Sequence, residues 1–161
     1  MRTVYRVLAF LVALEVAVQA MFIVYGDAGL GLWVEDGGVV DKATFDNAFE
    51  SGQAPFAEFQ AFVFHGMNGM MVIPTLALLL VVSSFFAKVP RGVVFALAVL
   101  GLVVLQVTLG LLGHSVAILG ALHGLNALAL FSTAAWTGIR VARLTRRAEG
   151  ASESAEQRVA V

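Results

Sequence analysis

The chain has 161 residues and no cysteine, and 60% of its side chains are hydrophobic while only 13% are charged. Its mean hydropathy of +0.90 excludes an ordinary soluble globular domain. Without cysteine there is no disulfide, no Cys-ligated zinc or iron–sulfur site and no thiol nucleophile, and the net charge of −1 argues against nucleic acid as a partner.

Uncharged apolar stretches define the predicted elements in chain order. A membrane-spanning helix needs about 20 apolar residues at a rise of about 1.5 Å per residue. This criterion predicts four transmembrane helices, near residues 4–26, 57–87, 92–113 and 116–140. The predicted fold class is therefore an all-α, integral membrane four-helix bundle, with residues 1–147 as its transmembrane domain.

One alternative for the first span remains open. Arg2 and Arg6 precede an apolar run that ends in Val18-Gln19-Ala20, which is also the pattern of a cleaved secretory leader covering residues 1–20.

The basic residues predict the orientation in the membrane. Nine of the ten Lys and Arg side chains flank the start of the first span, the turn between the second and third, or the end of the fourth. The loop 27–56 is acidic and has Lys42 as its single basic residue. By the positive-inside rule both termini are cytoplasmic and this loop is extracytoplasmic. We expect a multi-pass protein of a plasma membrane, of bacterial type, with the lipid bilayer as its first partner.

Two polar segments lie outside the predicted spans. In the loop, Asp41 is placed to cap a short helix that has Phe45, Ala48 and Phe49 on one face and Gly52 just past its end. This helix is expected either to lie on the bilayer surface or to act as a lid over the outer end of the bundle. The polar tail 148–161 is predicted to be disordered.

The three histidines all lie in or beside the outer ends of the spans. An ionisable side chain inside a membrane is expensive and indicates function by default. The phrases His65-Gly66-Met67-Asn68 and His123-Gly124-Leu125-Asn126 match at His, Gly and Asn. Gln19 also precedes Gly26 by seven residues, as Gln106 precedes Gly113. The chain therefore reads as a pseudo-twofold repeat of helix pairs.

Such a repeat predicts that His65 and His123 face each other at equal depth. Two neutral imidazoles that converge in an apolar bundle suit the two axial faces of a haem iron. The sequence therefore predicts haem b as the cofactor, with these two histidines as metal ligands. Further cofactor-binding candidates are the neighbours that share the histidine faces or lower the local bulk, namely Asn68, Asn126, Gly66 and Gly124.

Three other ionisable residues are candidates for supporting roles. His114 lies at the turn between the last two spans. It is expected to hydrogen-bond a haem propionate, to carry a proton, or simply to lie at the membrane interface. If it is a third metal ligand, a zinc or copper site is an alternative to haem. Glu15, midway along the first span, is either protonated, paired or facing a polar cavity. Glu58, seven residues before His65, either gates the site or is a solvated loop carboxylate. A purely structural histidine pair and a quinone contact are further alternatives.

The phrase Leu105-Gln106-Val107-Thr108-Leu109-Gly110, followed by Leu122-His123-Gly124-Leu125-Asn126-Ala127, resembles one half of heme A synthase. That family has two four-helix halves, each with a Gln-x-x-x-Gly phrase on one helix and a haem-ligating His on the next. The resemblance implies that His65 and His123 are the axial pair of one b-type haem on the outer side. The chain differs from the family in having a single half, and in carrying Phe62 where the family has a Glu three residues before the histidine.

The leading hypothesis is a membrane b-type haem-binding protein with bis-His ligation, serving electron transfer or haem handling near the extracytoplasmic face. Its partners would be a quinone or an extracytoplasmic redox protein, and a homodimer or a larger membrane complex is open. One alternative is a non-catalytic accessory subunit of a larger membrane complex. Another is a haem-modifying or quinone-reactive enzyme in which Glu15, Glu58 or His114 carries protons. Whether the protein turns over a substrate on its own is left open.

Overall fold

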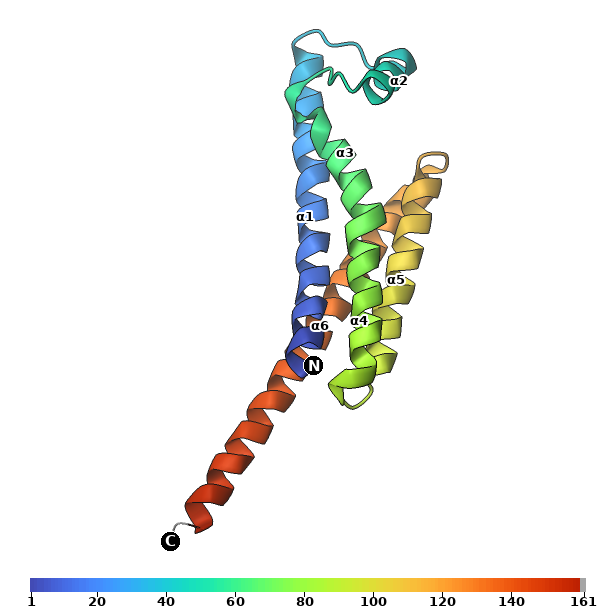
Figure 1. Ribbon diagram of the computed structural model, residues 1–161. Coiled ribbons are helices and arrows are strands. Elements are labelled where there is room, and N and C mark those ends of the chain that lie inside the picture. Colours follow the sequence, from blue (N-terminus) through green and yellow to red (C-terminus); the bar gives the residue numbers. More distant parts are fainter. Residues whose placement is uncertain (160–161) are drawn as a thin grey trace. The chain divides into compact units, whose positions relative to one another are not determined.

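The computed structural model describes residues 1–159, which form helices and connecting turns without any strand. Figure 1 shows the order of the helices along the chain. The elements are α1 (Arg2–Glu35), α2 (Lys42–Ser51), the 3-10 turn η1 (Ala57–Phe59), α3 (Gln60–Met67), the π-helical turn η2 (Asn68–Val72), α4 (Ile73–Ala87), α5 (Gly92–Gly113) and α6 (Ala117–Val159).

Four helical stretches are long and apolar enough to cross a membrane: Arg2–Glu35, Ala57–Ala87, Gly92–Gly113 and Ala117–Ala148. They correspond to the four predicted spans, so the prediction of an all-α, multi-pass membrane protein is confirmed at this level. Apolar helices of this length suit a lipid environment.

The chain divides into two compact units, each of which is described by itself. The core unit comprises Met1–Val16 and Ile73–Val161, and the loop unit comprises Ala17–Val72. The first span and the second span each contribute residues to both units.

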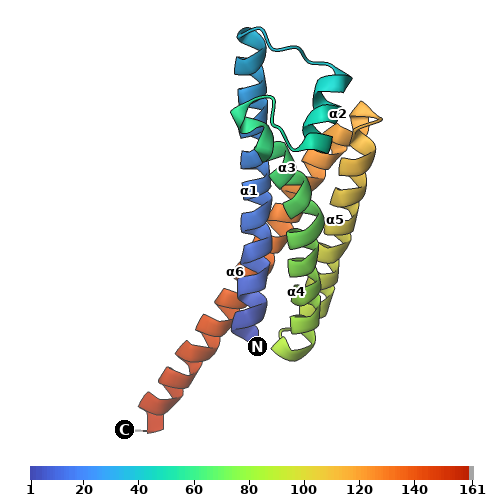
Figure 2. The same cartoon turned by 45° about the horizontal axis from the view of Figure 1, so that its top comes forward.

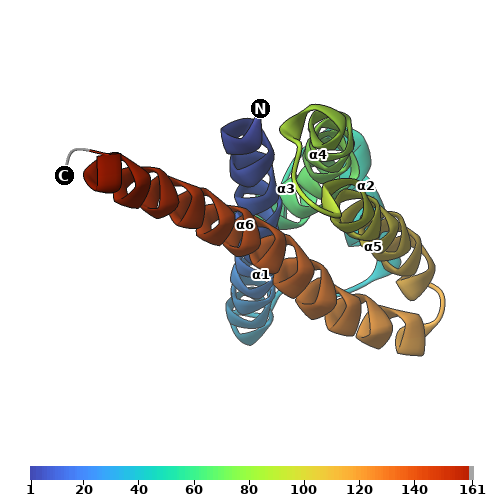
Figure 3. The ribbon, with the colours of Figure 1, turned by 90° about the horizontal axis from the view of Figure 1, so that it is seen from below.

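In the core unit, α5 contacts both α4 and α6, and Figures 2 and 3 show these helices side by side. Small buried side chains such as Ala9, Ala77 and Ala96 let the helices pack closely around Leu80 and Leu130. α5 and α6 approach closely at two glycines, because a Cβ atom added to Gly113 would lie 2.9 Å from the Cα of Gly120. This tight pairing holds the helix that carries His123 against the helix that carries Gln106.

Side chains also tie the helix ends of the core unit together. The buried Tyr5 hydroxyl donates to the carbonyl oxygen of Gly92 at 2.8 Å. The Arg2 guanidinium donates to the carbonyl oxygens of Ala87 and Lys88 at 3.3 and 3.2 Å. These hydrogen bonds satisfy main-chain oxygens at the turn between α4 and α5. Within this turn Lys88 and Arg91 adopt positive φ angles of 50° and 56°.

In the loop unit, aromatic side chains form a second, smaller core. Phe59 is buried and its ring lies 5.8 Å from that of Phe56 and 5.0 Å from that of Phe49 on α2. The N-cap prediction for α2 is confirmed, because the Thr44 backbone N–H donates to the Asp41 carboxylate at 2.7 Å. Gly52 ends the helix at a φ of 71°, a left-handed conformation that suits glycine. The apolar face of α2 therefore packs at least in part on the protein itself.

The first helix is longer than predicted, since it continues to Glu35 and does not end near Gly26. The glycines in this stretch allow helix packing and do not end the helix. A Cβ atom added to Gly26 would lie 2.8 Å from the Phe62 ring, and one added to Gly29 would overlap the Cβ of Glu58. These glycines let the second span approach α1 closely within the loop unit.

The second span contains a π-helical turn just before Pro74. Proline lacks the N–H that an α-helix would bond to the carbonyl four residues earlier, and its ring crowds that carbonyl. The wider turn over Asn68–Val72 relieves this crowding, and π-helical turns of this kind are frequent at functional sites.

The last helix also extends further than predicted. α6 continues to Val159, so residues 148–159 are helical where disorder was expected, while residues 160–161 lie outside the described part of the chain. Propagating an existing helix is far easier than nucleating one, and the Ala, Glu, Gln and Arg residues of this segment are good helix formers.

Candidate functional site

His65 is half-buried on α3 and contacts α1 within the loop unit. Its Nδ1 atom lies 3.2 Å from the main-chain oxygen of Gln19. Since a carbonyl oxygen only accepts hydrogen bonds, the proton of the neutral ring is assigned to Nδ1, and Nε2 then carries the lone pair. Beside it, the Phe64 ring packs on Phe22 with 5.9 Å between their centroids. The contact with the main-chain oxygen of Gln19 fixes the orientation of the His65 imidazole relative to α1.

The side chain of Gln19 is buried, with 8% of its surface exposed. Neither its Nε2 nor its Oε1 atom has a hydrogen-bond partner among the described residues. A buried polar group without a partner costs about 1–3 kcal/mol. Gly69, in the π-helical turn, leaves room for this amide, because a Cβ atom there would lie 3.2 Å from its Nε2.

His123 is half-buried on α6 and is held by α5 within the core unit. Its Nδ1 atom lies 2.9 Å from the main-chain oxygen of Gln106, and its Nε2 atom lies 3.1 Å from the side-chain Nε2 of the same residue. The Gln106 amide N–H donates to the Nε2 lone pair, so the neutral Nδ1–H form is again indicated.

Asn126 completes this cluster from one turn further along α6. Its amide donates to Gln106 Oε1 at 2.6 Å and to the carbonyl oxygen of Leu102 at 3.0 Å. Asn126 is buried, with 7% of its surface exposed. The prediction that the Asn and the His of this motif share one face of their helix is confirmed. Asn68, its counterpart, is half-buried at the first position of η2.

The two histidine environments therefore share one contact and differ in another. In each, a histidine Nδ1 bonds to the main-chain oxygen of a glutamine on the preceding span. The Gln106 side chain bonds to both His123 and Asn126, whereas the Gln19 side chain is without a partner among the described residues. His65 lies in the loop unit and His123 in the core unit, each with its own partners.

The glycines next to the histidines do not mediate helix contacts. A Cβ atom added to Gly66 or Gly124 would meet no described atom within 4 Å. Both glycines are exposed on the surface of their helices. Gly110 is the glycine that matters for packing here, since its added Cβ would lie 3.0 Å from the His123 ring.

The remaining candidates are His114, Glu15 and Glu58. His114 is exposed in the turn after α5, with its backbone N–H bonded to the oxygen of Leu112. Among residues 1–159 no group of three or more His, Cys, Asp or Glu side chains could hold a metal, so a three-ligand zinc or copper site that includes His114 has no support. Glu15 is half-buried in α1, and Glu58 lies in η1 against Gly29.

Sequence reasoning did not assign Gln19 and Gln106 as the partners of the histidines. The signal was present, because each glutamine precedes a glycine by the same seven residues. Spacing alone does not show that the bonded atom is the main-chain oxygen.

No protein-family model, curated protein or solved structure matches the chain. The contacts of the two histidines and the four apolar spans are therefore the observations on which a function rests.

Proposed function

We propose that this chain is a membrane haem b protein in which His65 and His123 would hold the haem iron, serving electron transfer or haem handling near the extracytoplasmic face. It would be organised, like the half of heme A synthase that it resembles, as two helix pairs related by a pseudo-twofold axis. Both termini would be cytoplasmic, in accord with the nine basic residues on that side.

The observation that carries the proposal is the matched Nδ1 contact. Both histidines bond through Nδ1 to the main-chain oxygen of a glutamine, at 3.2 and 2.9 Å. Metal-binding histidines almost always donate their second ring N–H to a carbonyl or carboxylate in this way, which fixes the tautomer and aims the other nitrogen at the metal. A structural pair has no need for the same contact at both copies of the motif.

The residues present fit haem b. Neutral imidazoles are the donors that a bis-His haem takes, and open space lies beside Gly66 and Gly124. When bound, the haem would supply one-electron redox chemistry. The chain would contribute two oriented imidazoles and an apolar setting. The amide nitrogen of Gln106 would have to give up its hydrogen bond to His123 Nε2 before that nitrogen could bind the iron. The amide oxygen of Gln106 would keep its hydrogen bond from Asn126.

The test is the visible spectrum of the detergent-purified protein, oxidised and dithionite-reduced, with haem quantified as the pyridine haemochrome. The wild type is expected to hold about one haem per chain and to show a sharp reduced α-band. The variants H65A and H123A are expected to lose this spectrum. H114A is the matched control, because His114 is exposed and outside both clusters; it is expected to keep the spectrum. Full haem retention in H65A and H123A, with normal far-UV circular dichroism, would refute the ligand assignment.

A second candidate is the accessory subunit of a larger membrane complex. The closed network of Gln106, His123 and Asn126 favours it, since both ring nitrogens of His123 have protein partners. If the role of His123 is only structural, these two ring-nitrogen contacts are sufficient for it. This candidate predicts a colourless protein that refuses added haem and copurifies with a membrane partner.

A further inference from the structure

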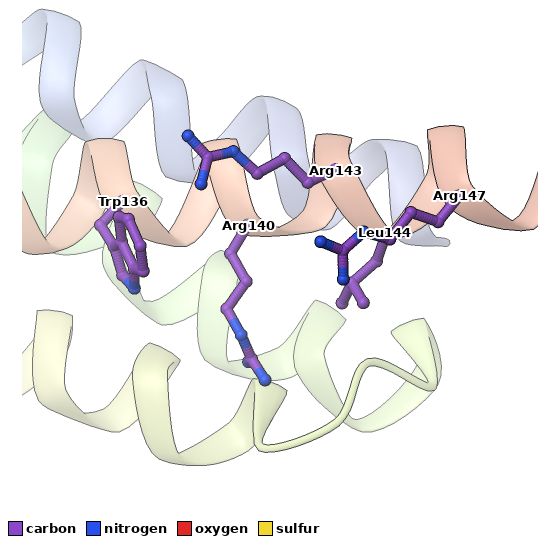
Figure 4. Close-up of a pocket in the computed structure, with 5 residues that line it drawn as sticks. All are labelled: Trp136, Arg140, Arg143, Leu144 and Arg147. Atoms are coloured by element: carbon purple, nitrogen blue, oxygen red, sulfur yellow. The ribbon is translucent and has the colours of Figure 1, made fainter.

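One face of α6 carries an open hollow of about 170 Å³ that the histidine chemistry does not use. Liquid water takes about 30 Å³ per molecule, so the hollow has room for a group of several heavy atoms. Five residues at helical spacing line it, as shown in Figure 4: Trp136, Arg140, Arg143, Leu144 and Arg147. We refer to these five residues as the basic hollow.

The basic hollow has three positively charged lining residues, Arg140, Arg143 and Arg147. Residues 59–148 contain no Asp or Glu, and the first acidic residue after them is Glu149, two positions past Arg147. Among the side chains that the structure describes, the ion pair found joins Lys42 and Asp46 on α2, far away in the chain. Three guanidinium groups close together on one helix repel one another, and an anion that lies between them relieves this repulsion.

Two of the three arginines, Arg140 and Arg143, have contacts with other described residues. Arg140 uses Nη1 to donate to the Pro90 oxygen at 2.7 Å, and its guanidinium lies 4.9 Å from the centre of the Phe95 ring. Arg143 lies 5.8 Å from the centre of the Trp136 ring. Figure 4 shows the guanidinium groups of Arg143 and Arg147 both turned back along α6 toward Trp136. A guanidinium carries five N–H donors in a planar fork that matches the oxygens of a phosphate.

The apolar members of the hollow point to the source of that phosphate. Trp136 is half exposed, with 50% of its surface accessible, and tryptophan prefers the boundary between hydrocarbon and headgroups. The same helix exposes large apolar side chains before Trp136 and just after it: Leu125, Leu128, Phe131 and Ile139. The basic hollow thus lies where a lipid-facing helix surface becomes cationic. We propose that it binds the phosphodiester headgroup of an anionic phospholipid, with Trp136 and Leu144 against the glycerol and the upper acyl chain.

The test uses the full chain in detergent in a W33F background, so that Trp136 is the only tryptophan. Its fluorescence is titrated with dioctanoyl-phosphatidylglycerol, with dioctanoyl-phosphatidylcholine and with inorganic phosphate. We expect saturable binding of the phosphatidylglycerol alone. R143Q/R147Q is expected to weaken this binding by roughly 30-fold, since each basic side chain near a membrane surface contributes about fivefold.

The matched control is K88Q/R146Q, which removes the same charge from residues outside the hollow; its affinity is expected to stay within about threefold of the wild type. The single variants R143Q and R147Q, each expected to lose about fivefold, test the assignment if the double variant does not fold. Equal losses in the two double variants would show unspecific attraction and overturn the site. Equally tight binding of inorganic phosphate would assign the hollow to a free anion, and an absence of phosphatidylglycerol binding would also refute the proposal. None of these outcomes depends on haem.

Discussion

At the scale of single residues, the haem-ligand and the structural interpretation of His123 give different roles to the side chain of Gln106. Its amide nitrogen contacts His123 Nε2 and its amide oxygen accepts from Asn126. In the haem-free protein this stabilises α5 against α6. In a haem-bound protein the same amide competes with the iron for one lone pair.

We therefore expect Q106L to lower the free energy of unfolding of the haem-free protein by about 1–3 kcal/mol, because two hydrogen bonds are lost in a half-buried place. Haem binding should become about fivefold tighter, since nothing has to leave Nε2 first. Thermal unfolding followed by circular dichroism and a haem titration measure the two effects.

The control for Q106L is T108V on the same helix. The Thr108 hydroxyl is exposed and donates only to the carbonyl oxygen of Val104, so neither stability nor haem affinity should change much. Weaker haem binding by Q106L would contradict the competition and would mean that Gln106 holds His123 in its ligating orientation.

Asp41 gives a prediction about pH. The hydrogen bond from the Thr44 N–H stabilises the ionised carboxylate and lowers the pKa of Asp41. Because the folded pKa lies below the unfolded value of about 3.9, the cap stabilises α2 fully above that pH and is lost as the pH falls through the lower folded value. The amide shift of Thr44, followed by NMR between pH 6 and 2, should titrate with a midpoint below about 3.9.

The variant D41N is the control for this titration. Asparagine is an equally good N-cap but does not titrate, so α2 should persist and the Thr44 shift should lose its pH dependence. A wild-type midpoint at or above the unfolded value would mean that the carboxylate does not cap the helix in solution.

At the scale of elements, glycines allow helices to pack closely where a larger side chain would not fit. Gly29 lies against Glu58, while a Cβ atom on the nearby Gly31 would meet nothing within 4 Å. G29A should lower the free energy of unfolding by about 1–3 kcal/mol through overpacking. G31A, in the same helix, should be neutral or stabilising by about 0.5–1 kcal/mol through helix propensity. Melting temperatures of the two variants in one detergent measure the difference, and equal values would exclude a close contact at Gly29.

The elements that the sequence predicted well were those set by length and charge. Four spans followed from the minimum length of a membrane helix, and the caps of α2 followed from Asp41 and Gly52. The end of α1 was misjudged at Gly26, because a glycine that permits close packing and a glycine that ends a helix look alike in sequence. The π-helical turn over Asn68–Val72 was not predicted, because it depends on how the backbone relaxes around the ring of Pro74.

The candidate site was predicted only in part. The repeated His-Gly-x-Asn phrase identified both histidines and Asn126, whose contacts the structure describes. The bonds to Gln19 and Gln106 join residues on different spans, and their main-chain oxygens have no signature in a sequence. The haem itself stays a prediction.

At the scale of the whole molecule, the orientation in the membrane is open to a simple chemical test, because the chain has no native cysteine. Single cysteines at Asp36 and Ser154 replace exposed residues at opposite ends of the predicted topology. With a membrane-impermeant maleimide on intact cells, D36C should be labelled and S154C should not, until the cells are permeabilised. The reverse pattern would place both termini outside and contradict the positive-inside assignment.

The last helix has a consequence for anything joined to its end. α6 has 43 residues and so measures about 64 Å, roughly twice the thickness of the hydrocarbon layer. The residues past Ala148 extend it by about 16 Å. A fluorescent protein fused after this helix would be held at a defined distance from the bilayer, whereas a flexible linker would let that distance vary. Energy transfer to labelled lipids would then report a narrow range of distances.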